Sequence, residues 1–143
     1  MTDGDWAASR PETAVLMMTE DEALTVRVRH EPGYVLVTVA GELDFASVAG
    51  LRERLFPLSA TGRPLVADLD RVSFIDAAGL GALAGAARRA AAAGTSLRVV
   101  CARPRIRRLF RVAGLDQAML AGTLDEALGM LAPATQAEQA AAV

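Results

Sequence analysis

Two aspartates, Asp68 and Asp70, stand in VADLDRV directly after an apolar run, in a spacing that could support phosphoryl transfer. In such a pair one carboxylate attacks phosphorus, and the other acts as acid or base beside Mg²⁺. That chemistry also needs a lysine for the phosphoryl oxygens and a second acidic pair for the metal. The chain has no lysine and no later Asp-Asp pair. We therefore interpret the aspartates as polar residues at a strand end, and expect no metal site.

A second candidate lies in FIDAAGLGALAG, where Gly79, Gly81 and Ala84 fit the dinucleotide-binding spacing G-x-G-x-x-[GA]. A dinucleotide site requires a strand that runs directly into the first glycine, and an acidic residue roughly 20 residues later for the ribose. Here residues 76–78 intervene, and the region around Val99 and Val100 holds no carboxylate. The pattern indicates a small-residue helix, and we expect no cofactor.

The third candidate is the start of that helix. Asp76 is of the type that caps a helix and accepts hydrogen bonds from the N–H groups of the first turn. The same N-terminus favours negative charge, so a phosphoryl group there would be tolerated by the domain while repelling a partner. Glycines at 79, 81 and 85 leave one helix face bare. That face could admit another protein's backbone or could pack on a sheet.

The remaining reactive residue types are too few for other catalytic sites. The chain contains one histidine and one cysteine, which excludes a His/Cys metal cluster and an intramolecular disulfide. His30 precedes Pro32-Gly33 and is predicted to be solvated in a turn. Cys101 follows the apolar run SLRVV and is predicted to be a buried thiol rather than a nucleophile. We expect a protein without enzymatic activity and assign no catalytic residue.

Composition limits the partners. The 143 residues carry a net charge of −2, and all 15 basic residues are arginine. This balance gives no overall attraction to nucleic acid or to an anionic membrane. Five arginines between 103 and 111 are predicted to form a solvated helix face, and no aromatic residues interleave there to stack bases. The N-terminus lacks the basic region of a secretory signal, so we expect a cytoplasmic protein.

Strand and helix patterns alternate along the chain. Strands are predicted at 24–28, 34–41, 65–69 and 96–100, with a turn at 31–33 that makes the first two a hairpin. A helix is predicted after Asp44, which would cap it, with inward positions at Phe45, Val48, Leu51 and Leu55. Helices with alternating strands predict an α/β domain over residues 23–131, with flexible tails at 1–22 and 132–143.

Three further helices follow from the same kind of pattern. The helix after Asp76 is expected to turn Leu80, Leu83 and Ala87 inward and to end at Gly94. The next begins at Pro104, ends at Gly114 and faces inward at residues that include Ala113. Thr123 and Glu126 form a capping box for the last helix.

Three stretches together resemble one family. VAGELDFASVAGLRERL, LVADLDRVSFIDAAGLGAL and LRVVCARPRIRRLFRVAGLD are similar, in order and spacing, to the STAS-domain anti-sigma factor antagonists of bacteria. The most specific parts are G-E-L-D at 41–44 and D-x-x-G-L-G at 76–81. The resemblance covers residues 24–131 and implies a single STAS-like α/β domain with a central mixed sheet of four to five strands and helices packed on it.

The resemblance also implies partner switching in sigma factor regulation. In that family the antagonist binds an anti-sigma factor, an ATP-binding serine kinase, and so frees a sigma factor. The kinase then phosphorylates the first hydroxyl residue after the motif's aspartate, and a metal-dependent phosphatase reverses this. The partner-binding residues carried over are Asp44, Asp76, Ala77, Ala78, Gly79, Leu80, Gly81 and Leu83.

The sequence departs from the family at its switch. The phosphoacceptor position is Ala77 and the next residue is Ala78, so neither carries a hydroxyl. Three consequences compete: an antagonist that binds without this switch, a scaffold or ligand-sensing module with a non-kinase partner, or phosphorylation moved to Ser73, Ser47 or a tail hydroxyl. We favour the first, because the docking motifs remain while the hydroxyls are gone. The sequence does not determine an oligomeric state.

Overall fold

β1 (Leu24–Glu31) and β2 (Tyr34–Leu43) form an antiparallel hairpin that opens the part of the chain described by the computed structural model, residues 24–131. Gly33 makes the turn with φ +88°, a conformation that side chains disfavour. β1 is longer than predicted because its ladder with β2 is continuous from Leu24↔Gly41 to Glu31↔Tyr34, and β2 extends to Leu43 by pairing with the third strand. Alternate residues of β1 are buried, as its period-two pattern predicts. β2, whose apolar run indicates a strand covered on both faces, has buried residues that alternate with partly buried ones along most of its length.

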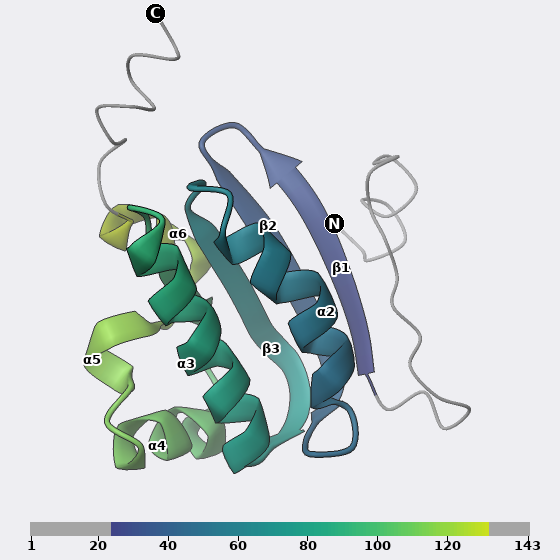
Figure 1. The fold of residues 1–143 in the computed structure, drawn as a ribbon. Helices are drawn as coiled ribbons and strands as arrows, with labels where there is room; N and C mark the ends of the chain where they lie inside the picture. The colour runs from purple at the N-terminus through teal and green to yellow at the C-terminus, as the bar shows by residue number, and fades with distance from the viewer. Residues whose placement is uncertain (1–23, 132–143) are drawn as a thin grey trace, which may run out of the picture.

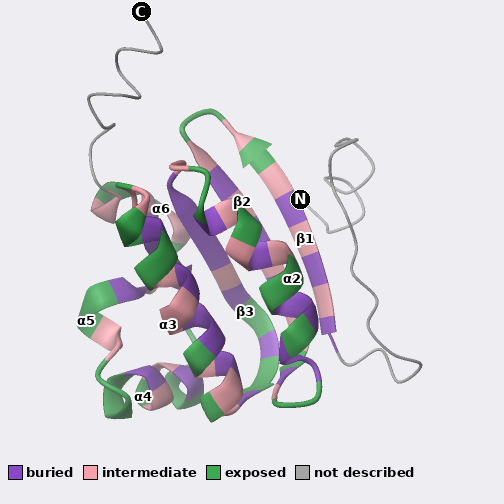
Figure 2. Ribbon diagram, viewed as in Figure 1, coloured by how far each residue is buried: buried purple, intermediate pink, exposed green. Residues whose placement is uncertain are grey.

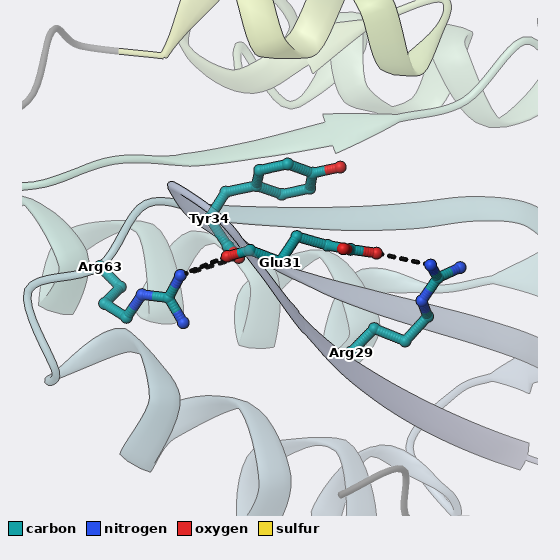
Figure 3. A network of polar contacts seen from close by, with 4 residues as sticks. All are labelled: Arg29, Glu31, Tyr34 and Arg63. Atoms are coloured by element: carbon teal, nitrogen blue, oxygen red, sulfur yellow. Dashed lines mark hydrogen bonds and ion pairs between the residues drawn. The ribbon is translucent and has the colours of Figure 1, made fainter. Parts of the chain in front are cut away.

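Arg63, in the loop before the next strand, forms hydrogen bonds with the turn of this hairpin. Its guanidinium donates to the main-chain oxygens of Glu31 and Tyr34 (Figure 3). The same group lies 3.2 Å from His30 Nδ1. Glu31 also pairs with Arg29 across 2.6 Å. His30 is exposed, in agreement with its predicted place in a turn.

Three parallel strands complete a five-stranded sheet in the order β1-β2-β3-β4-β5: β3 (Leu65–Ile75), β4 (Leu97–Val100) and β5 (Leu120–Ala121). The prediction of a mixed sheet of four to five strands is confirmed. β3 extends six residues beyond the predicted end at residue 69, because it keeps pairing with β2 through two irregularities as far as Leu43↔Ile75.

Helices cover both faces of the sheet (Figure 1). α2 (Val48–Ser59) and α3 (Ala77–Ala92) lie side by side on one face, and α4 (Pro104–Val112) and the short α5 (Asp116–Met119) extend the same layer. α6 (Leu124–Met130) packs on the opposite face, over a small cluster of Val66, Val100, Ala121 and Ala127. The main core lies between the sheet and α2 to α5, where buried residues gather (Figure 2).

The predicted start of α2 is wrong. The helix begins at Val48 with Ser47 at its N-cap, and Phe45, expected in the core, is 81% exposed. Residues 44–47 form a separate turn before the helix, which shifts the inward stripe to positions that begin at Val48. Val48, Leu51 and Leu55 are buried as expected.

The other helix boundaries agree better with the sequence. α3 begins after Asp76, and Gly94 follows its C-cap with φ +82°. Pro104 opens α4, and Thr123 caps α6 by accepting a hydrogen bond from Glu126 N at 3.1 Å. Ala113, expected inward, is exposed because α4 ends at Val112, and the sequence did not predict α5.

The tails predicted at 1–22 and 132–143 lie outside the described residues. Across residues 24–131, the structure holds no helix with the length and apolar character needed to cross a membrane.

Candidate functional site

The carboxyl ends of β2 and β3 meet at one edge of the sheet, and the predicted site forms there. Leu43 pairs with Ile75, the last residue of each strand, and Asp76 N donates to Leu43 O at 3.2 Å. The extra length of β3 therefore carries the start of α3 to the turn that follows β2. Asp44 and Asp76, which are 32 residues apart in the chain, become neighbours in this way.

Asp76 uses both carboxylate oxygens. Oδ1 accepts hydrogen bonds from Ala78 N at 2.9 Å and Gly79 N at 3.1 Å, which makes Asp76 the N-cap of α3 as predicted. Oδ2 accepts from Phe45 N at 3.1 Å, in the turn after β2. One side chain thus caps the helix and fixes the neighbouring loop.

Asp44 organises that loop rather than α2. Its Oδ1 accepts from Ser47 N at 3.0 Å, while Ser47 Oγ accepts from Asp44 N at 3.0 Å. Ser47 is 3% exposed and its hydroxyl donates to Glu42 O at 2.7 Å. These reciprocal bonds follow capping-box geometry and hold Phe45 outside the core.

The eight residues predicted to bind a partner divide into two layers. Ala77 and Gly81 are exposed, and Asp44, Asp76, Ala78 and Leu80 are intermediate in exposure. Gly79 and Leu83 face the core, where Leu83 is fully buried. A Cβ at Gly79 would lie 2.8 Å from Leu43 O, so this glycine permits close packing of α3 on β2. A protein that docks here can touch the first six residues but not Gly79 or Leu83.

Two residues that sequence reasoning missed lie at the same edge. Phe45 is 81% exposed and Phe74 is 48% exposed, in a chain that contains only four phenylalanines. Phe74 pairs with Glu42 near the end of β3, opposite the turn that carries Phe45. We call the surface of Phe45, Phe74, Asp76, Ala77 and Gly81 the entry surface. Helical periodicity predicts that Phe45 faces the core. Phe74 belongs to no predicted element, because the strand is predicted to end at residue 69 and β3 ends at Ile75.

The entry surface is poorly suited to a phosphate ligand. The backbone N–H groups of Ala78 and Gly79, which a bound phosphate would use, already donate to Asp76. The dinucleotide reading of Gly79 and Gly81 is not supported by this geometry.

Asp68 and Asp70 bond to the backbone. Asp68 Oδ1 accepts from Asp70 N at 2.9 Å, and Asp70 Oδ1 accepts from Ala102 N at 2.8 Å, which ties β3 to the segment after β4. Between residues 24 and 131 no group of three potential metal ligands is close enough to hold an ion. These contacts favour the structural interpretation of both aspartates.

Cys101 and the arginines of α4 also have structural contacts. Cys101 has no exposed surface, and burial raises the pKa of its thiol. Arg107 donates to Cys101 O at 2.8 Å and Arg103 donates to Asp70 O at 3.1 Å. Arg105, Arg108 and Arg111 are exposed like Arg103, so four of the five arginines agree with the predicted solvated face.

Comparison with known proteins gives a consistent set of matches. The model of the STAS domain family matches residues 25–127. An anti-sigma-B factor antagonist of Bacillus subtilis is 36% identical over 92 residues, which span 64% of this chain and 84% of the relative. A Staphylococcus aureus protein of the same name is 32% identical over 97 residues, spanning 67% of this chain and 90% of that protein.

Solved structures agree with these relatives. The crystal structure of an anti-sigma factor antagonist from Mycobacterium paratuberculosis superposes with a TM-score of 0.70 at 30% identity, covering 78% of this chain and 97% of that one. The residues matched by the family model, 25–127, include all those of the entry surface.

Proposed function

Because the chain belongs to the STAS domain family, we propose that it is an anti-sigma factor antagonist, a protein that frees a sigma factor by binding its anti-sigma factor. The names of the relatives from Bacillus subtilis and Staphylococcus aureus support this activity. It is a binding function and requires no catalytic group in this chain. Sigma factors act on RNA polymerase, so the proposal also places the protein in the cytoplasm.

The partner we propose is an anti-sigma factor of the ATP-binding serine kinase type. The support is the motif at Asp76 to Gly81, which resembles the switch motif of the family. The acceptor position of the motif is Ala77, an exposed residue in the first turn of α3. A kinase docked there finds no hydroxyl, and the complex persists in the presence of ATP.

The observation that carries the proposal is the exposed side chain of Phe45, whose backbone N–H donates to Asp76. Aromatic side chains are enriched at protein interfaces, and an exposed one on a fixed loop is a suitable anchor. Hydrogen bonds from Asp44, Ser47 and Asp76 hold the Phe45 backbone before any partner arrives. A preorganised loop loses little conformational entropy on binding, which favours affinity.

The testing experiment compares the wild-type protein with Ala77→Ser for binding to the host's ATP-binding anti-sigma factors, with and without ATP. We expect the wild type to stay bound in ATP and the serine variant to be phosphorylated and released. Phosphate incorporation by mass spectrometry and complex formation by size-exclusion chromatography give independent readouts. Absence of binding to every such kinase would overturn the proposal.

A second variant tests the aromatic anchor. Truncation of Phe45 should weaken the complex by at least tenfold, about 1.4 kcal/mol, because a central aromatic contact is lost. Val112→Ala is the matched control, since Val112 is 79% exposed but lies on α4. Both variants should retain wild-type stability. Equal affinity of Phe45→Ala and the wild type would remove Phe45 from the interface.

Phosphorylation at another serine is a weaker alternative. Ser47 is 3% exposed and its hydroxyl is engaged, so a kinase cannot reach it without unfolding the turn. Ser73 is exposed on β3 and lies 3.4 Å from Gly41 O. Stoichiometric phosphate on Ser73 in cells would contradict phosphate-independent binding.

One observation favours a second candidate, a ligand-sensing module. A cavity of about 330 Å³ lies between α3, β4 and α5, with walls that include Ala87, Leu97 and Met119. Ser96 Oγ and Arg98 Nε belong to lining residues, and both atoms are buried without a hydrogen-bond partner among the described residues. A volume of this size is at the lower end for small-molecule sites. Binding of a cell-derived metabolite, together with indifference to every ATP-binding kinase, would favour this second function.

A further inference from the structure

A groove runs between α2 and α3, on the outer surface of the helix layer. α2 contributes Arg52 and Phe56, which are four residues apart and therefore on one helix face. α3 contributes the facing stripe Gly81, Gly85, Arg88, Arg89 and Ala92. The two helices lie side by side (Figure 1), and the space between these residues measures about 530 Å³.

The groove is deep because α3 has glycines, which lack side chains, where it passes α2. A Cβ at Gly85 would meet Phe56 Cζ at 3.4 Å, and a Cβ at Gly81 would meet nothing within 4 Å. The guanidinium of Arg89 lies 4.1 Å from the centre of the Phe56 ring, a cation–π contact that fixes its position over the floor. The groove is therefore shaped before any ligand binds.

The charge of the groove is opposite in sign to that of the whole chain. Arg52, Arg88 and Arg89 line it, and no carboxylate is among its lining residues. Within residues 24–131 none of the three guanidinium groups forms an ion pair. Glu53 follows Arg52 on α2 but does not line the groove. Guanidinium groups bind carboxylates through paired hydrogen bonds, so three in one groove favour a ligand with several carboxylates.

Gly81 connects the groove to the entry surface, since it belongs to both. A protein bound on the entry surface near Gly81 would therefore have the groove beside it. We propose that the α2–α3 groove binds an acidic segment of the anti-sigma factor, rich in aspartate or glutamate, next to its main contact. This inference rests on the proposed function and specifies the chemistry of the partner's second contact.

The test measures affinity for the ATP-binding anti-sigma factor across a salt series from about 50 to about 300 mM, where screening of exposed charges increases. The variant is Arg52→Gln with Arg88→Gln, which removes two positive charges and leaves the Arg89–Phe56 contact in place. We expect at least tenfold weaker binding at low salt, a slower association rate, and a shallower dependence of log Kd on log salt. The matched control is Arg105→Gln with Arg108→Gln on α4, which should behave as the wild type does.

Three outcomes would overturn the inference, and they differ from one another. If the wild type binds and the groove variant has the same affinity and the same salt slope, the groove is not part of the interface and the proposed function stands. An equal loss in the α4 control means that total charge, not the groove, governs binding. If the wild type binds no such kinase, the proposed function fails and the groove inference fails with it.

Discussion

Asp76 is the residue on which the candidate site depends most. It accepts two hydrogen bonds from the first turn of α3 and one from the turn after β2. Sequence reasoning found the first role, because an aspartate before an alanine-rich helix is a recognisable cap. It could not find the second, since the contact with Phe45 joins residues 31 positions apart.

Asp76→Ala should lower the free energy of unfolding by about 2 kcal/mol, at the upper end for the loss of a cap, because three N–H groups lose their acceptor. Asp76→Asn should cost less, since the amide oxygen still accepts. Urea denaturation measures both. Thr123→Ala, which removes a cap with a single bond at α6, is the control, and an equal loss there would mean that the two additional bonds of Asp76, including the one from Phe45 N, contribute nothing.

Gly79 and Gly81 have the same residue type and opposite surroundings. Gly79→Ala should destabilise the protein by about 1–3 kcal/mol, because the new methyl group would lie 2.8 Å from Leu43 O and Ile75 Cγ1. Gly81→Ala should stabilise it by about 0.5–1 kcal/mol, since alanine is the better helix former and its Cβ meets nothing. Thermal unfolding of the pair checks both signs. A neutral or stabilising Gly79→Ala would show that the packing of α3 on β2 is looser than described, and a destabilising Gly81→Ala would contradict the prediction for that site.

At the scale of elements, sequence patterns located the hairpin, the strands and the helices well where the hydrophobic periodicity agrees with the glycine, proline and capping residues at the ends of elements. Gly94, Pro104 and Thr123 mark helix ends correctly because each acts through its own backbone or side chain. The patterns failed where pairing with a strand distant in the sequence determines the length of an element. β3 continues past Asp70 through polar residues because β2 lies beside it, and this extension is what brings Phe74 and Asp76 to the site.

The end of α3 offers a prediction at this scale. Gly94 N donates to Ala91 O at 3.0 Å and Thr95 N to Ala90 O at 2.9 Å, with Gly94 in the left-handed region at φ +82°. Gly94→Ala should cost about 1–2 kcal/mol, because a Cβ is unfavourable in that conformation. Gly129→Ala, inside α6 with open space around it, should not destabilise the protein. Chemical denaturation of both variants checks this difference, and a neutral Gly94→Ala would mean that the turn relaxes.

At the scale of the whole molecule, one core holds most elements together, and Cys101 reports on it. The thiol is fully buried in the main cluster, beyond β4 and beneath α4. Iodoacetamide should therefore modify it far more slowly in the native protein than in urea, because exposure requires opening of the core. Mass spectrometry over time measures the rate. Rapid alkylation without denaturant would show that α4 detaches locally.

The same burial predicts a loss of stability at high pH. Burial raises the pKa of Cys101 above its ordinary value of 9.0, so between the two values the unfolded chain has released a proton that the native state keeps. The contribution of the Cys101 thiol to the free energy of unfolding is therefore complete below pH 9.0 and decreases as the pH rises above that value. Tyr34, whose pKa burial also raises, acts in the same direction from its ordinary value of 10.0. Cys101→Ala should show a shallower decline between these values in urea titrations, and an identical decline would assign it to other groups.

The exposed position of Ala77 has a consequence for how this protein can change over generations. Every alanine codon becomes a serine codon by a single base substitution, and a hydroxyl at this first turn would project into solvent without displacing any neighbour. Under the proposed function, the fold therefore sets no barrier between a permanent binder and a reversible one. Retention of alanine in a lineage would reflect selection on signalling, since folding places no demand on the choice.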